Sequence, residues 1–142
     1  MVNLIPLAGR GSRFSDIGIS LPKPLIPVSG KPMIQKAVED LPPCTKWVFI
    51  VLQEHVERYS IDDVIRTVCP DATIITTPEV TNGQASTCML AESVIEDGEE
   101  VFIGATDVGI YCDYLKLKKV SMTADCVIPS ITEHECLKKN PN

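Results

Sequence analysis

Short apolar runs alternate along the chain with segments of helical pattern. Five of the runs are rich in β-branched residues and bounded by turn residues, which is typical of buried strands. These are Val2–Leu7, Lys46–Leu52, Ala72–Thr76, Glu100–Ala105 and Asp125–Pro129. Helices are predicted over Pro32–Leu41, Ile61–Val68 and Gln84–Ile95. A proline in the first turn supports the first helix, and Ser60 as N-cap supports the second.

The order of these elements predicts the fold class. Strands that alternate with helices form a parallel sheet with right-handed crossovers and helices on both faces. We therefore expect an α/β fold, a Rossmann-like three-layer α/β/α arrangement with a mostly parallel sheet, as a single domain over residues 1–142. Ligands of such sheets bind beyond the carboxyl ends of the strands. Three loops fall there and are expected to form one site: Leu7–Arg13, Thr77–Gly83 and Thr106–Asp107.

Composition and charge restrict the partners. One domain is the ceiling for 142 residues, and a hydrophobic content of 44% is ordinary for a globular core. The net charge of −6 argues against nucleic acid or an anionic membrane as partner, because either needs a sustained basic face. No apolar run reaches the roughly 18 residues of a membrane span, and no signal peptide is recognisable. We expect a cytoplasmic protein with a small-molecule partner.

The cysteines and histidines give weak signals. The six cysteines are Cys44, Cys69, Cys88, Cys112, Cys126 and Cys136. They form no C-x-x-C pair and several lie in apolar runs, so buried free thiols are predicted. The alternative is a zinc site of Cys136, His134 and a distant thiol, but the stretch "HEC" has no second tight pair to complete it. His55 and His134 are predicted to be surface histidines, since neither has a nucleophile or second ligand nearby in sequence.

The loop after the first predicted strand carries the chemistry. Gly9 and Gly11 allow a tight turn and leave backbone N–H groups open to an anion. Arg13 offers a forked set of donors for phosphate oxygens, and Lys23 adds a compact cation. The prolines on either side of Lys23 fix its backbone, which lowers the entropy cost of holding its ammonium group. Two cations and open amides indicate a triphosphate site.

The motif belongs to neither of the two common phosphate loops. No G-K-[ST] follows at the spacing of a Walker A loop, so a P-loop kinase or hydrolase is disfavoured. Phe14 stands where the dinucleotide fingerprint has its third glycine. The pattern A-G-x-G-x-R followed by P-K-P-L, in "LAGRGSRF…LPKPLIPVSGKPMI" over residues 7–34, resembles the sugar-phosphate nucleotidyltransferases. These nucleoside-diphosphate-sugar pyrophosphorylases condense a nucleoside triphosphate with a sugar phosphate or similar phosphorylated alcohol and release pyrophosphate.

Two later stretches extend the resemblance. "TNGQAST" over residues 81–87 is similar to the family loop that opens a helix and receives the base and the activated substrate. "IGATDVGI" over residues 103–110 places Asp107 where the family has its first metal-binding aspartate. The resemblance thus implies Mg²⁺ at Asp107, with Arg13 and Lys23 holding the phosphates as catalytic residues. The nucleotide cradle that it implies consists of Leu7, Ala8, Gly9, Gly11, Ser12, Gly83 and Gln84.

The sequence also departs from the family. Members with sugar substrates are longer and take a second metal-binding aspartate from a later segment, so an apparently C-terminally truncated domain is expected. Asp113 is a further carboxylate that could approach the metal or substrate. Apolar surface left by an interrupted domain would favour a homo-oligomer. The alternative function is a nucleotide-binding module without turnover, which pyrophosphate release would distinguish from the enzyme.

Overall fold

The computed structural model describes residues 1–107 and 113–129. The chain divides into two compact units, Met1–Tyr111 and Cys112–Asn142. A four-stranded sheet forms the centre of the first unit, in the order β5-β4-β1-β6. Its strands are β1 (Val2–Leu7), β4 (Lys46–Leu52), β5 (Thr73–Thr77) and β6 (Val101–Ile103). Every pair in this sheet is parallel, which confirms the expected α/β class.

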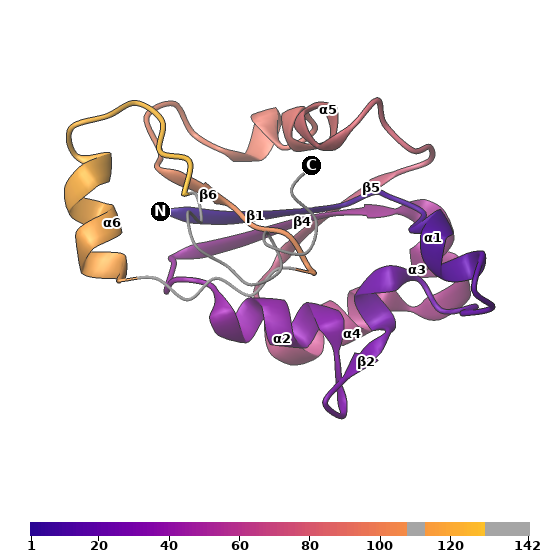
Figure 1. The fold of residues 1–142 in the computed structure, drawn as a ribbon. Coiled ribbons are helices and arrows are strands. Elements are labelled where there is room, and N and C mark those ends of the chain that lie inside the picture. Colours follow the sequence, from indigo (N-terminus) through magenta and orange to yellow (C-terminus); the bar gives the residue numbers. More distant parts are fainter. Residues whose placement is uncertain (108–112, 130–142) are drawn as a thin grey trace, which may run out of the picture. The chain divides into compact units, whose positions relative to one another are not determined.

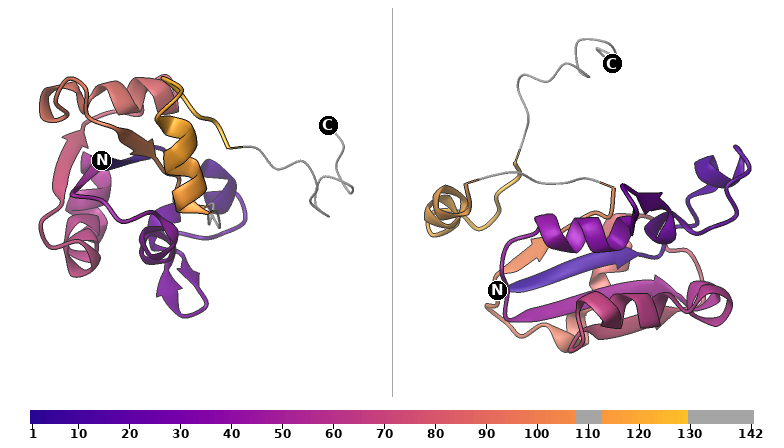
Figure 2. Two further views of the ribbon diagram at one scale, coloured as in Figure 1. Left: turned by 90° about the vertical axis from the view of Figure 1, so that its left-hand side faces the viewer. Right: turned by 90° about the horizontal axis from the view of Figure 1, so that it is seen from below.

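Helices cover both faces of the sheet (Figures 1 and 2). On one face lie α2 (Met33–Asp40) and α4 (Ile61–Val68), and on the other lie α5 (Gln84–Met89) and the 3-10 helix η2 (Glu92–Val94). Successive residues of a strand point to opposite faces, so each strand supplies two cores. Ile5 and Phe49 pack with Ile34 and Ile65 on the first face. Val48 packs with Leu4 and Ala91 on the second face. The three-layer arrangement is therefore present.

Several short elements surround the end of the sheet where β1 and β4 finish. They are α1 (Ser12–Ser15), the 3-10 helix η1 (Lys23–Leu25), the hairpin strands β2 (Pro27–Val28) and β3 (Lys31–Pro32), and α3 (Gln53–Tyr59). Figure 1 shows α1 and α3 at this end of the sheet. None of these short elements is predicted by the apolar pattern, yet α1, η1 and α3 each contribute residues to the walls of the cavities described below.

Two predicted elements are wrong. The helix predicted over residues 84–95 ends at Met89 and is followed by η2, because Thr87 is the one buried side chain of α5 and no long apolar stripe holds a longer helix. Residues 125–129 form no strand, since they pair with no strand among the described residues. The second unit instead contains α6 (Tyr114–Ser121). None of the helices in the described residues is long and apolar enough to cross a membrane.

The four described cysteines are free thiols in different surroundings. Cys69 is buried, Cys44 and Cys88 are half-buried, and Cys126 is exposed, so the prediction of burial is wrong for Cys126. The remaining cysteines and His134 lie outside the described residues, as does the zinc site considered from them. Burial, and to a smaller extent the neighbouring Cys44 thiol, raises the pKa of the Cys69 thiol to about 11.

We expect iodoacetamide at pH 8 to alkylate Cys126 in the folded protein and to leave Cys69 unmodified. The thiolate is the reactive form, and Cys69 is both protonated at this pH and closed to the reagent. Peptide mapping by mass spectrometry measures each site separately. The same labelling in denaturant provides the control, because both thiols should then react equally. Early labelling of Cys69 in the folded chain would contradict its placement in the core.

Candidate functional site

A cavity of about 300 Å³ lies at the carboxyl ends of β1 and β6. We call it the strand-end cavity. Its walls come from residues 6–11 after β1, residues 80–87 around the start of α5, residues 105–107 after β6, and the start of η1. The convergence of three loops at this edge of the sheet follows from the parallel strand order, because each loop leaves the same end of its strand.

Eight of the ten residues singled out from the sequence line the strand-end cavity: Leu7, Ala8, Gly9, Gly11, Lys23, Gly83, Gln84 and Asp107. Ser12 and Arg13 do not line it. Both belong to α1 and are exposed to solvent. The roles of both residues at the nucleotide therefore remain predictions. The role of Arg13 requires that its side chain reach the phosphates of a bound ligand.

Gly11 brings the first loop against Lys23. Its φ of +64° lies in the left-handed region that glycine adopts readily, and a Cβ built on it would lie 3.1 Å from the Lys23 Cβ. Lys23 itself starts η1, and the flanking residues Pro22 and Pro24 are both buried. The Leu25 N–H closes this turn by donating to the Pro22 carbonyl at 2.9 Å. The backbone of Lys23 is thus fixed from both sides.

Lys23 and Asp107 form an ion pair inside the cavity. The Lys23 Nζ lies 2.6 Å from Asp107 Oδ2, and the two side chains are 26% and 45% exposed. The hydrogen bond from Lys23 lowers the pKa of the Asp107 carboxyl, while partial burial opposes this. The ion pair of a carboxyl with a lowered pKa stabilises the fold fully at pH values above the ordinary pKa of the carboxyl. This stabilisation is lost as the pH falls through the lowered pKa. Near neutral pH the cavity therefore holds one cation and one carboxylate in contact.

Two threonines that sequence reasoning missed close the loop before α5. The Thr81 and Thr87 hydroxyls form a hydrogen bond with each other at 2.5 Å, and both hydroxyl oxygens lie within hydrogen-bond distance of the Gly83 carbonyl, at 3.1 and 3.2 Å. Gly83 has φ +120°, a conformation that side chains strongly disfavour. The spacing T-x-G-x-x-x-T is the signal that could have found this arrangement, since threonine hydroxyls commonly bond to nearby backbone groups.

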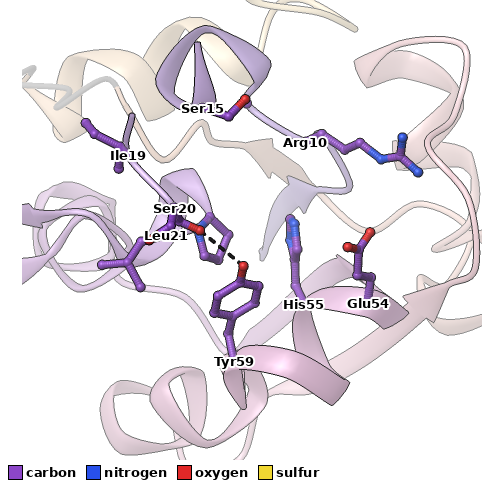
Figure 3. Close-up of a pocket in the computed structure, with 10 residues that line it drawn as sticks. Arg10, Ser15, Ile19, Ser20, Leu21, Glu54, His55 and Tyr59 are labelled. Carbon is purple, nitrogen blue, oxygen red and sulfur yellow. Dashed lines mark hydrogen bonds between the residues drawn. The ribbon is translucent and has the colours of Figure 1, made fainter. Parts of the chain in front are cut away.

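A second cavity, of about 360 Å³, lies between α3 and the loop that carries α1 (Figure 3). We call it the α3 cavity. Gly11 lines both cavities. Tyr59 of α3 joins the two walls, because its hydroxyl donates to the Ser20 carbonyl at 3.1 Å. Figure 3 shows Glu54, His55 and Tyr59 extending from α3 toward this loop.

His55 is buried, so its prediction as a surface histidine is wrong. Only 5% of the residue is exposed, because it lies on α3, a helix that the apolar pattern did not predict. Burial lowers the pKa of His55. The carboxylate of Glu54 raises this pKa, and the charge of Arg10 lowers it further. The imidazole is thus neutral near pH 7.

Asp113 acts as a helix cap in the second unit. Its Oδ1 accepts hydrogen bonds from the Leu115 and Lys116 backbone N–H groups, at 3.0 and 3.1 Å. These bonds satisfy two donors at the start of α6. A role for Asp113 near a metal or substrate stays a prediction.

The family is decided by a match over residues 4–116 to the model of the MobA-like NTP transferase domain. The chain belongs to this family. The match includes both cavities of this NTP transferase domain and the ion pair between Lys23 and Asp107. It confirms the resemblance to nucleotidyltransferases that the first loop indicated.

Similar proteins place the NTP transferase domain within longer chains. It is 33% identical over 105 residues to "Bifunctional protein GlmU" of Thermotoga petrophila, covering 74% of this chain and 22% of that one. The inositol-1-phosphate CTP transferase from T. maritima matches in structure with a TM-score of 0.64 at 18% identity, over 75% of this chain and 43% of that one. The nucleoside-diphosphate-sugar pyrophosphorylase from Vibrio cholerae RC9 matches with a TM-score of 0.63 at 20% identity, over 82% and 53%. The chain thus spans about half the length of these solved structures.

Proposed function

We propose that the chain carries the nucleotide-binding part of an enzyme that joins a nucleoside triphosphate to a phosphorylated sugar or similar phosphorylated alcohol and releases pyrophosphate. The observation that carries this proposal is the contact of Lys23 with Asp107 in a cavity walled by the glycine-containing loop. Membership of the NTP transferase family supports the same activity. A cation for phosphates, a carboxylate and open backbone amides are what phosphoryl chemistry requires at one place.

Each part of the strand-end cavity has a role in this reaction. The amides from Leu7 to Gly11 cradle the base and the phosphates, and Gly83 and Gln84 lie beside the base. Lys23 binds the triphosphate and offsets the negative charge that develops as the acceptor phosphate attacks the α-phosphorus. Arg13 contributes a second cation from α1. The reaction needs no covalent intermediate, because orientation of the two substrates and neutralisation of charge provide the catalysis.

The residues at the end of β6 fit a magnesium ion. Mg²⁺ is typically held by one or two carboxylates together with substrate phosphates and water. Asp107 supplies one carboxylate that is 45% exposed and faces the cavity. Within the described residues no group of three or more His, Cys, Asp or Glu side chains could hold a metal by itself. The ion would therefore bind most tightly together with the triphosphate, whose charge it would neutralise.

A second candidate is a nucleotide-binding module without turnover. It is favoured by the lining of the strand-end cavity, which among the described residues contains a single carboxylate, that of Asp107. Such a module would keep the strand-end cavity and bind a triphosphate without transferring it. Pyrophosphate release separates the two functions, because only the enzyme produces it when a phosphorylated acceptor is added.

Thermal melting against ATP, GTP, CTP, UTP and dTTP, each with and without Mg²⁺, tests the site. We expect one nucleotide to raise the midpoint and Mg²⁺ to enlarge the shift, because a ligand that binds only the folded state stabilises it. Asp107→Asn should remove the enlargement by Mg²⁺ and leave most of the metal-free shift. Equal loss of both parts would show that the carboxylate is structural. No shift with any nucleotide would reject both candidate functions.

A further inference from the structure

The loop before α5 contains an asparagine followed directly by a glycine, Asn82–Gly83, and no other asparagine in the sequence precedes a glycine. An asparagine side chain can close a five-membered ring on the backbone nitrogen of the next residue when that nitrogen is accessible. A glycine in the second position gives the least obstruction, because it has no Cβ. The pair lies at the edge of the strand-end cavity, since Gly83 lines the cavity and Asn82 does not.

The structure leaves both reacting groups of this pair free. Asn82 and Gly83 are exposed, and neither the Asn82 side chain nor the Gly83 N–H forms a hydrogen bond with any described residue. A Cβ built on Gly83 would have nothing within 4 Å, so the backbone is open on this side. A bonded N–H would first have to lose its partner, and that cost is absent at Gly83.

Asn3 provides the contrasting case within the same chain. It is fully buried in β1, and its Nδ2 donates a hydrogen bond to the Pro42 carbonyl at 2.8 Å. The next residue, Leu4, is held in the sheet between β4 and β6. Ring closure at Asn3 would require both the side-chain bond and the sheet to open, whereas ring closure at Asn82 requires neither. Of these two asparagines, only Asn82 is therefore expected to react in the folded protein.

We propose that Asn82 is a site of spontaneous modification, at which the folded protein converts it to isoaspartate and aspartate. The Gly83 nitrogen attacks the side-chain carbon Cγ of Asn82, and the bond from Cγ to Nδ2 breaks, so that ammonia leaves with the proton of the N–H. Water then opens the succinimide ring. Hydrolysis at Cγ gives aspartate, and hydrolysis at the backbone carbonyl gives isoaspartate, in which the chain continues through the former side chain.

Isoaspartate at this position displaces the loop that the two threonines close. It adds one methylene to the backbone just before Gly83, whose carbonyl accepts a hydrogen bond from the Thr87 N–H at 3.1 Å and lies within bonding distance of the Thr81 and Thr87 hydroxyls. Both products also add a negative charge beside a cavity that already contains the Asp107 carboxylate. Under the proposed function, on which this consequence rests, both changes weaken triphosphate binding, the charge by repulsion.

Ageing of the nucleotide-free protein at pH 8 tests the modification itself. Peptide mapping by mass spectrometry detects the exchange of an amide for a carboxyl group, and electron-transfer dissociation separates isoaspartate from aspartate. A synthetic peptide of residues 81–87, aged in parallel, sets the time scale. We expect the folded protein to convert Asn82 on that time scale and to leave Asn3 unchanged. Asn82→Gln is the matched control, because it keeps an exposed amide but would need a larger ring, and its peptide should stay unmodified.

Two outcomes overturn the proposal: an intact Asn82 after the synthetic peptide has converted completely, or conversion of Asn3 as fast as Asn82, which would place the reaction in the unfolded chain. Neither outcome depends on nucleotide binding, so failure of the modification and failure of the proposed function are distinguishable.

Nucleotide protection relates the modification to the proposed site. A nucleotide that covers Gly83 should slow conversion about tenfold at a concentration of about ten times its Kd, since only the free protein then reacts. Converted protein should bind the nucleotide more weakly than fresh protein, and Asn82→Asp should lie between them because it has the charge without the added methylene. Asn82→Gln aged for the same time should keep its affinity. Equal affinity of converted and fresh protein would overturn the displacement of the loop.

Discussion

Replacing Lys23 by alanine is expected to weaken triphosphate binding and to strengthen the binding of a divalent cation to the same cavity. Loss of one charged hydrogen bond to phosphate should cost about 1.5 to 3 kcal/mol, or roughly 10-fold to 150-fold in affinity. The cation should bind more tightly because Asp107 loses the ammonium group that lies 2.6 Å from its carboxylate. Opposite changes for two ligands are difficult to obtain from general destabilisation.

Two measurements on one protein preparation test this expectation. Nucleotide titration calorimetry gives the triphosphate affinity, and electron paramagnetic resonance of free Mn²⁺ gives the cation affinity, since carboxylate sites accept Mn²⁺ as they do Mg²⁺. Lys31→Ala is the matched control, because Lys31 pairs with Glu39 at 2.6 Å in an exposed ion pair away from the cavity. A decrease or no change in Mn²⁺ affinity for Lys23→Ala would show that the ion pair does not compete with the metal.

The central elements could be predicted from the sequence because burial decides them. The bounds of β1, β4 and α4 coincide with their predictions, and each of these elements has several fully buried apolar residues. The bounds of β5 and β6 differ from their predictions by up to two residues, and both are edge strands that pair with a neighbour on one side only. The run over residues 125–129 has the same composition but no pairing partner among the described residues. Apolar composition therefore predicts a strand only where a neighbouring strand can pair with it.

α3 could not be predicted because local polar contacts define it. Its sequence "QEHVERY" has little apolar periodicity, and hydrogen bonds of i,i+4 spacing hold its exposed side: Gln53 to Glu57 at 2.6 Å and Arg58 to Glu54 at 2.8 Å. Its buried side contains His55, which no pattern distinguishes from a surface histidine. The strand-end cavity was largely predictable, because glycines, Lys23 and Asp107 follow buried strands. The α3 cavity was not, because it needs the position of α3 relative to the loop.

Replacing Phe49 by alanine is expected to cause the largest loss of stability, about 3 to 5 kcal/mol. Phe49 is fully buried in β4, the strand between β1 and β5, where it lies in register with Ile5 on one side and Ile74 on the other. Its ring also stacks on Trp47, with centroids 5.9 Å apart. Removing it leaves a cavity at the centre of the sheet, and the whole domain has about 5 to 15 kcal/mol to lose.

Urea denaturation followed by far-ultraviolet circular dichroism measures this loss without relying on Trp47, whose fluorescence the substitution itself would change. Ile103→Ala is the control, because Ile103 is 52% exposed on the edge strand β6 and its truncation should cost about 0.5 kcal/mol or less. A loss below about 1.5 kcal/mol for Phe49→Ala would contradict the central position of β4.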